Sequence, residues 1–320
     1  MLWKQICTFR YDEKRKYNYY SILIKDVNYS IQFYKYYKTW GFIPFGEAGT
    51  AHFIENIEDP GGFSSELLQH YSKYKIAVFS LSYYRNEVWE SIPYDSLFGG
   101  RNLSQIAVNP FVSNQVFVSS FQDGLLELND FEPTILYDET NSGLESLVLP
   151  GSPNFRSLRV SATAFDRTGL LWSLSSLLFE PLKSYDPITG NWNSYDFSSI
   201  IQDAIRDELG YFDLAIDNNG TKWIGAYTNG IYAYNETVSN NPLRNIRTEE
   251  QGLPFPRVNA VAIDNRNQLW VGTFTGLRVL YNTSGFYEDS NPTLSSIIIL
   301  ENGIAKELLE GETITDIKVD

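Results

Sequence analysis

The chain carries a short alternation of apolar and polar residues that ends in Asp or Asn and occurs five times. Because successive side chains of a β-strand point to opposite faces, each alternation predicts a half-buried strand. The terminal residues are separated by 57, 51, 47 and 56 residues and are Asn109, Asp166, Asp217, Asp264 and Asp320. A Trp stands six residues after three of them, at Trp172, Trp223 and Trp270, and Phe117 is its looser counterpart after Asn109. The pattern predicts a structural repeat of about fifty residues.

The clearest copy runs from Gly252 to Asn282 and predicts three strands joined by two tight turns. These strands are expected at 258–263, 269–273 and 277–281. The copy at 214–234 matches it closely, and its Asn219-Gly220 pair is a strong signal for a hairpin turn. A fourth strand is expected in the spacers, for example at 192–197 and 243–247, and it completes a four-stranded antiparallel blade.

Repeated four-stranded units of this length predict an all-β fold, a β-propeller of about five or six blades that is a fragment or incomplete. A solenoid is the alternative, but its rungs are usually shorter and stack in one dimension. The blades are legible over 97–310, and 311–320 opens a further, truncated blade. Residues 1–96 form a divergent N-terminal region that can supply one or two irregular blades, from strand-like runs at 19–24, 76–81 and 88–92.

The composition supports strands and limits the partners. Aromatic residues make up 15% of the chain, which favours β-structure. The 39 acidic residues outnumber the 25 Lys and Arg residues, and the net charge is −14. This balance argues against binding to nucleic acid or to an anionic membrane surface. Any anionic ligand therefore needs a local basic patch. Residues 1–40 differ from the rest, with eight Lys and Arg against three Asp and Glu.

The sequence offers little for catalysis, cofactors or metals. The single cysteine, Cys7, excludes an internal disulfide, and two histidines, His52 and His70, make a Cys/His zinc site unusual. Both histidines lie outside the repeat without a nucleophile motif nearby, and no glycine-rich phosphate-binding pattern is present. We therefore expect a protein that is not an enzyme and has no cofactor or metal. No export signal or membrane span is visible in the chain as written.

The segment from Gly252 to Asn282 resembles the two-component-regulator propeller repeat, and Lys222-Trp-Ile-Gly225 and Asn229-Gly-Ile-Tyr-Ala-Tyr234 resemble the same motif. The longer stretch from Arg257 to Asp320 is similar to the PorZ-type surface components of the type IX secretion system. The basic, Tyr-rich start does not resemble that family, and the family's C-terminal module is absent from the sequence.

This resemblance implies an exported protein of the Bacteroidota, at the cell surface or in the periplasm, that acts beside a sortase and other secretion-system proteins. It also implies a non-enzymatic propeller that binds anionic lipopolysaccharide and presents it for attachment to secreted cargo. One alternative is the periplasmic, oligosaccharide-sensing propeller of a hybrid two-component receptor, since such receptors carry the same repeat. A third is a polysaccharide hydrolase or lyase.

Several recurring residues invite functional interpretations that packing explains better. Trp at a fixed repeat position can offer a platform for sugars, but it more often fills the core between blades. The Asp residues at the strand ends suggest calcium, but Asp followed by Asn or Arg is typical of turns.

Three arginines are the candidate ligand-binding residues. Arg159 and Arg257 stand seven residues before Asp166 and Asp264, and Arg101 stands eight before Asn109. Each precedes the first strand of a blade, the strand that lines the channel of a propeller. Guanidinium groups gathered on one rim are expected to clamp phosphate or carboxylate on an anionic glycan. The alternative is that they pair with some of the chain's many carboxylates.

Overall fold

The protein consists of antiparallel β-strands in a computed structural model that describes the following residues: 4–12, 17–25, 29–37, 80–85, 88–93, 96–100, 102–149, 151–152, 154–205, 210–301 and 303–319. The interpretations of Arg101, His52 and His70 fall outside these residues. The chain divides into two units, which are described separately. The first comprises 1–102, 131–133 and 320, and the second comprises 103–130 and 134–319.

The first unit contains a five-stranded antiparallel sheet in sequential order. Its strands are β1 (Lys4–Asp12), β2 (Tyr17–Lys25), β3 (Tyr29–Tyr37), β4 (Ser80–Arg85) and β5 (Val88–Pro93). The predicted strands at 19–24 and 88–92 are confirmed as parts of β2 and β5. The run at 76–81 overlaps β4 by only two residues. How 1–96 divides into blades stays a prediction.

The repeats fold into separate antiparallel sheets. The first is β6 (Leu103–Val108), β7 (Gln115–Ser120), β8 (Gly124–Asn129) and β9 (Glu132–Tyr137). The second is β10 (Val160–Phe165), β11 (Leu171–Ser175), β12 (Leu182–Tyr185) and β13 (Trp192–Tyr195). The third is β14 (Tyr211–Ile216), β15 (Lys222–Ala226), β16 (Ile231–Tyr234) and β17 (Leu243–Ile246). The fourth has three strands, β18 (Val258–Ile263), β19 (Leu269–Thr273) and β20 (Gly276–Leu280). The strands predicted in the repeats are confirmed, including the fourth strands β13 and β17.

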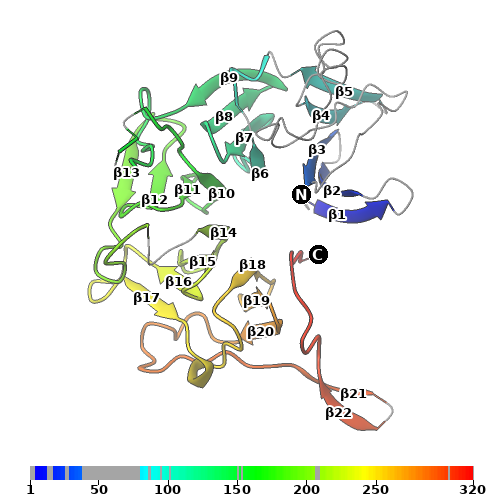
Figure 1. The fold of residues 1–320 in the computed structure, drawn as a ribbon, viewed down its shortest axis with the longest axis vertical. Coiled ribbons are helices and arrows are strands. Elements are labelled where there is room, and N and C mark those ends of the chain that lie inside the picture. Colours follow the sequence, from blue (N-terminus) through cyan, green and yellow to red (C-terminus); the bar gives the residue numbers. More distant parts are fainter. Residues whose placement is uncertain are drawn as a thin grey trace. The chain divides into compact units, whose positions relative to one another are not determined.

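Within the second unit the sheets are arranged as blades. The first strands β6, β10, β14 and β18 lie side by side in chain order, and the later strands of each sheet extend outward from them (Figure 1). Sequential four-stranded meanders with the first strand innermost are the architecture of a β-propeller. The predicted all-β propeller fold is thereby confirmed.

The hydrophobic core lies between neighbouring blades. One cluster of buried residues joins the first and second sheets and includes Phe117, another joins the second and third and includes Trp172, and a third joins the third and fourth and includes Trp223. Both Trp172 and Trp223 are fully buried. A buried Trp contributes a large apolar area to such an interface, which explains why the repeat keeps an aromatic residue at this position.

Every innermost strand of the second unit has a β-bulge at its second residue, since the register shifts there in all four sheets. A bulge bends a strand and redirects a side chain. The bulged residues are Ser104, Ser161, Phe212 and Asn259. Three of the four are polar, and Phe212 is the exception.

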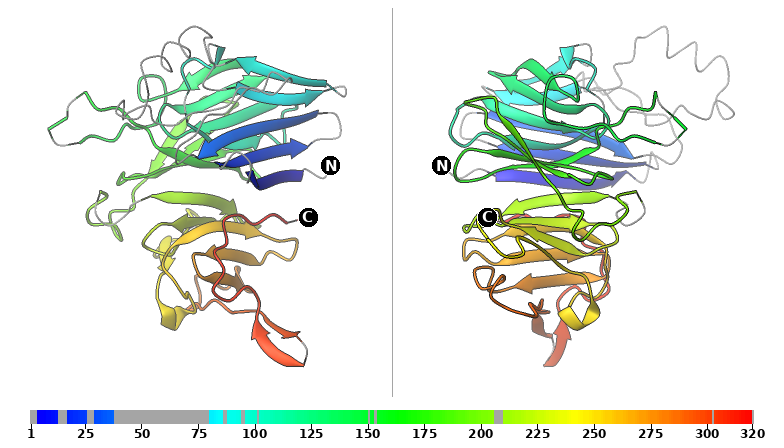
Figure 2. Two further views of the ribbon diagram at one scale, coloured as in Figure 1. Left: turned by 45° about the vertical axis from the view of Figure 1, so that its right-hand side comes forward. Right: turned by 90° about the vertical axis from the view of Figure 1, so that its left-hand side faces the viewer.

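A hairpin and an extended segment follow the fourth sheet. The hairpin consists of β21 (Ile298–Glu301) and β22 (Ile304–Glu307) and stands away from the sheets of its unit (Figure 2). Residues 311–319 form no strand, but the Ile314 N–H donates a hydrogen bond to the Thr273 carbonyl at 3.0 Å. The truncated blade predicted at 311–320 stays a prediction.

Candidate functional site

In the three repeats that have an Asp and a Trp at these positions, the two residues are joined by a hydrogen bond. The indole Nε1–H of Trp172 donates to Asp166 at 2.7 Å, and the equivalent bonds from Trp223 to Asp217 and from Trp270 to Asp264 are both 3.0 Å. A buried indole N–H needs an acceptor, and the spacing of six residues supplies it across the hairpin. The fixed spacing of six residues between Asp and Trp was visible in the sequence, although the hydrogen bond between them was not predicted.

The other oxygen of each carboxylate closes the turn. In the third sheet, Asp217 Oδ1 accepts hydrogen bonds from the backbone N–H groups of Asn219 and Thr221 at 2.8 and 2.9 Å. Gly220 has a φ of +82°, which lies in the left-handed region that favours glycine. Turn formation therefore accounts for these Asp residues, and their oxygens are already occupied by donors.

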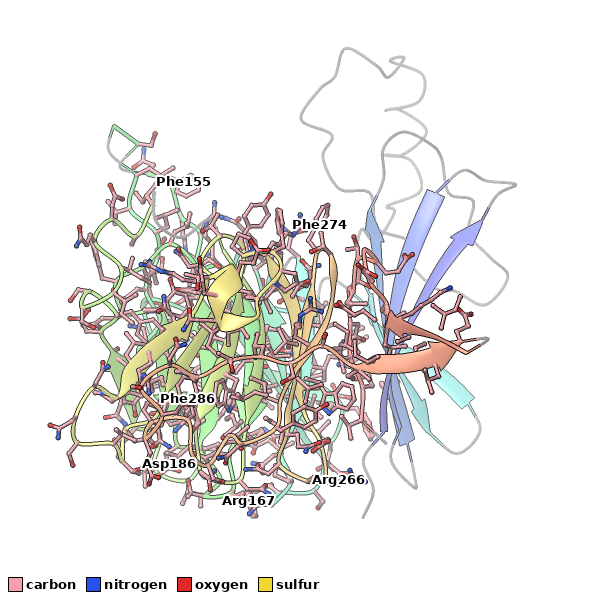
Figure 3. The ribbon with its side chains drawn as sticks, turned by 90° about the horizontal axis from the view of Figure 1, so that it is seen from below. Phe155, Arg167, Asp186, Arg266, Phe274 and Phe286 are labelled. Atoms are coloured by element: carbon pink, nitrogen blue, oxygen red, sulfur yellow. The ribbon has the colours of Figure 1, made fainter. Side chains whose placement is uncertain are left out.

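The two ends of the blades differ in character. Phe155 and Phe274 lie at one end, and Arg167, Arg266 and Asp186 lie at the opposite end (Figure 3). The first end, which we call the rim, holds the turn between the second and third strands and the residues that lead into each inner strand. Arg159 and Arg257 directly precede β10 and β18 and so belong to the rim.

Arg257 lies among three aromatic rings. Its guanidinium carbon is 4.8 Å from the ring centroid of Tyr227 and 5.3 Å from those of Phe212 and Phe274. Its Nε donates to Asn259 Oδ1 at 2.9 Å, which fixes the plane of the guanidinium. Rings at these distances attract the cation and hold it in place.

The aromatic residues around Arg257 form two pairs, with centroid separations of 5.7 Å for Phe212–Tyr227 and 5.4 Å for Phe255–Phe274. Their exposed fractions are 37% for Phe212 and Tyr227, 39% for Phe255 and 41% for Phe274. Contiguous exposed apolar patches are a feature of interaction sites and ligand-binding grooves, which makes these grouped rings a candidate binding surface. We call these four residues together with Arg257 the rim cluster.

Arg159 repeats part of this arrangement one interface earlier. Its guanidinium carbon lies 5.3 Å from the Phe121 ring centroid, and its backbone adopts a φ of +55°. Its buried Nε has no hydrogen-bond partner among the described residues, and burial lowers the pKa of Arg159. Arg159 thus contacts one aromatic ring, whereas Arg257 contacts three rings and is also hydrogen-bonded to Asn259.

The third blade breaks the pattern. The residue before its inner strand is Gly210, where the neighbouring blades have Arg159 and Arg257. The carbonyls of all three accept a backbone hydrogen bond from the residue that follows the second strand: Ser176 to Arg159, Tyr227 to Gly210 and Phe274 to Arg257. These three positions are therefore structurally equivalent. The exposed aromatic rings lie between the third and fourth blades because of the residues that the sequence places there, since the backbone arrangement is the same in all three blades.

Neither rim arginine has an ion-pair partner within the described part of the chain. Other arginines there do, since Arg156 lies within salt-bridge distance of Asp123, Asp138 and Glu139. A guanidinium presents five N–H donors in a planar fork that suits phosphate and carboxylate. The rim cluster can therefore bind an anionic group with Arg257 and an apolar or ring surface with the aromatic residues. The aromatic partners were missed in the sequence because they come from three separate segments.

Comparisons with known proteins agree with the propeller fold. The family described as "Two component regulator propeller" matches residues 252–275, which confirms the resemblance of that segment. No curated protein matches the sequence. A solved structure of PorZ, a surface component of the type-IX secretion system of Porphyromonas gingivalis, is similar with a TM-score of 0.65 and 16% identity, covering 98% of this chain and 48% of that one. The extracellular domain of a hybrid two component system of B. thetaiotaomicron is similar with a TM-score of 0.48 and 13% identity, covering 96% and 38%.

The chain thus spans about half the length of the PorZ structure that it matches. Both similar structures are surface or extracellular proteins. Among the described residues, no helix has the length and apolar character needed to cross a membrane.

Proposed function

We propose that this chain is a non-enzymatic binding and scaffold propeller of a type IX secretion system, and that it presents anionic lipopolysaccharide for attachment to secreted cargo beside the sortase. Its place would be the cell surface or the periplasm. The propeller fold shared with a surface component of that system supports the assignment. One observation carries the binding role: Arg257 is held among partly exposed aromatic rings without a carboxylate partner in the described residues.

The electrostatics make Arg257 the group to test. The chain has a net charge of −14, so its overall field repels an anionic glycan. Attraction must come from a cation that no carboxylate neutralises. The Nε of Arg257 is engaged by Asn259, and this contact orients the Nη groups for an acidic group of the ligand. Arg159 provides a second cation on the same rim.

The experiment compares Arg257→Ala with Arg266→Ala in binding to purified lipopolysaccharide that carries an acidic polysaccharide. Arg266 is an exposed arginine of the same blade at the opposite end (Figure 3) and serves as the matched control. Loss of a charged hydrogen-bonded contact is expected to weaken binding roughly tenfold for Arg257→Ala, with no change for Arg266→Ala. Unchanged affinity in Arg257→Ala overturns the assignment of the site.

A second candidate function is recognition of oligosaccharides by the sensor domain of a two-component receptor. The family match over 252–275 favours it, since that family is named for such receptors. The two functions differ in the charge of the ligand. Tight binding of neutral oligosaccharides, together with no binding of acidic lipopolysaccharide, would support the sensor.

A further inference from the structure

An arginine and an aromatic ring form the same pair at two interfaces between blades. Arg257 directly precedes β18, and its guanidinium carbon lies 4.8 Å from the ring centroid of Tyr227, the first residue after β15 of the preceding blade. Arg159 directly precedes β10 and lies 5.3 Å from the ring centroid of Phe121, the first residue after β7 of the preceding blade. The two arginines and the two rings thus occupy equivalent positions of the repeat. We call each arginine with its ring a rim pair.

The interface between the second and third blades has neither member of the pair. Gly210 stands in the position of the arginine, and Ser176, the first residue after β11, stands in the position of the ring. A Cβ placed on Gly210 would have the Ser176 hydroxyl as its nearest contact, at 3.7 Å. The blades pack at this interface without a rim pair, so blade packing alone does not explain the two pairs.

Both rim pairs hold a cation that nearby carboxylates leave unneutralised. Arg156, three residues before Arg159, lies within salt-bridge distance of three carboxylates, whereas Arg159 forms no ion pair with a described residue. The buried Nε of Arg159 also has no hydrogen-bond partner among the described residues. A buried donor without a partner is destabilising, and a bound acidic group would supply the missing acceptor or charge.

The two rim pairs lie at the same end of the blades, with the entry of the third blade between them. Their inner strands β10, β14 and β18 are neighbours in space (Figure 1). Packed sheets are about 10 Å apart, so two such steps separate the guanidinium groups by at most roughly 20 Å. Each guanidinium is held by its own rings, and a single phosphate or carboxylate therefore contacts one arginine and not both. The small side chains at Gly210 and Ser176 leave the rim between the two pairs open.

We infer that the rim binds its ligand at two points, and that the ligand is a glycan chain with at least two acidic groups. One acidic group is bound at Arg257 and another at Arg159, and the sugars between them cross Gly210 and Ser176. The kind of ligand rests on the proposed function, and the inference adds that one acidic sugar does not give the full affinity. Two linked contacts bind more tightly than one because the second contact forms within the same complex.

The test compares two probes in binding to the 320-residue chain: the acidic polysaccharide released from purified lipopolysaccharide, and its single repeating unit with one acidic group. Affinities are expressed per acidic group, which removes the statistical advantage of a long chain. The wild type is expected to bind the polysaccharide at least roughly tenfold more tightly than the unit.

The variants remove one rim pair at a time. Arg159→Gly gives the second blade the residue that the third blade has at Gly210, and glycine suits the φ of +55° at this position, so the fold should be retained. Arg159→Gly and Arg257→Ala are each expected to lose the tenfold preference for the polysaccharide, while binding of the unit falls only about twofold because one pair remains. Arg167→Ala is the control, since Arg167 belongs to the second blade and lies at the opposite end (Figure 3). It should behave as the wild type does.

The outcomes separate this inference from the proposed function. Polysaccharide binding that weakens in Arg257→Ala and stays unchanged in Arg159→Gly overturns two-point binding and leaves the proposed function supported. Equal affinities of the wild type for the polysaccharide and the unit also overturn two-point binding. If neither probe binds the wild type, the proposed function is overturned, and two-point binding is overturned with it.

Discussion

The Nζ of Lys222 lies 3.7 Å from the centroid of the Trp172 ring, across the interface between the second and third blades. Both side chains are fully buried. The cation also pairs with Glu236, and burial lowers the pKa of Lys222. The contact joins the second and third blades beside the buried cluster that contains Trp172, so it contributes to the packing of these two blades.

Replacing Lys222 with Ala is expected to destabilise the protein by about 2 kcal/mol or more, because the cation–π contact and the buried stem are both lost. Lys306→Ala provides the control, since Lys306 pairs with Glu301 on the exposed hairpin and should cost less than about 1 kcal/mol. Urea unfolding measures both. Equal losses in the two variants would contradict the structural role of Lys222.

Asp217→Ala removes the acceptor of the Trp223 indole N–H and of two backbone N–H groups of the turn. Because Trp223 is fully buried, its N–H is left without a partner, and a loss of about 1–3 kcal/mol in unfolding free energy is expected. The same change at Asp264 should cost less, since Trp270 is only partly buried and water can replace the acceptor. Chemical denaturation of the pair tests this order, and a larger loss at Asp264 would refute it.

Asp213 is also expected to make stability depend on pH. Its pKa in the folded protein, about 6, lies above the ordinary value of 3.8, so the folded state binds more protons than the unfolded state between these values. Its contribution to stability is therefore greatest below about pH 4 and is lost as the pH rises through about 6. Protonation removes the cost of desolvating the partly buried carboxylate, which is the largest cause of the raised pKa.

The measurement compares unfolding free energies of the wild type and Asp213→Asn from pH 4 to pH 7. As the pH rises, the unfolding free energy of Asp213→Asn should increase relative to that of the wild type, by at most about 3 kcal/mol. Carboxylates with lowered pKa values, such as Asp138 and Asp264, are present in both proteins and cancel in the difference. A difference that stays constant over this range would show that the pKa of Asp213 is not raised.

The repeat made most of the blade structure predictable. Alternating residues located the inner strands, and the Asn219-Gly220 turn located a hairpin, because both signals depend on residues close together in sequence. The fixed spacing of Asp217 and Trp223 reflects a cross-hairpin bond of the same local kind. In the fourth sheet the prediction of β20 was displaced by one residue at each end.

The rim cluster was predictable only in part. Arg257 stood out because it recurs at the position of Arg159, before an inner strand. Its partners Phe212 and Tyr227 belong to the preceding blade and meet it only through the packing of β14 against β18. Asp213 likewise accepts hydrogen bonds from Gln105 on β6 and from Val261 on β18. Both residues lie more than forty positions away in the sequence, so no local pattern predicts these bonds.

Substitution of Phe212 by Ser tests the central claim most directly, because it separates binding from folding. Ser is the residue at the equivalent bulge of the first two blades, at Ser104 and Ser161, and Phe212 is 37% exposed, so the unfolding free energy should change by less than about 1 kcal/mol. The rim cluster nevertheless loses one wall beside Arg257. We predict roughly tenfold weaker binding of acidic lipopolysaccharide with stability retained. Unchanged affinity in a stably folded Phe212→Ser protein would contradict the assignment of the rim cluster as the binding site.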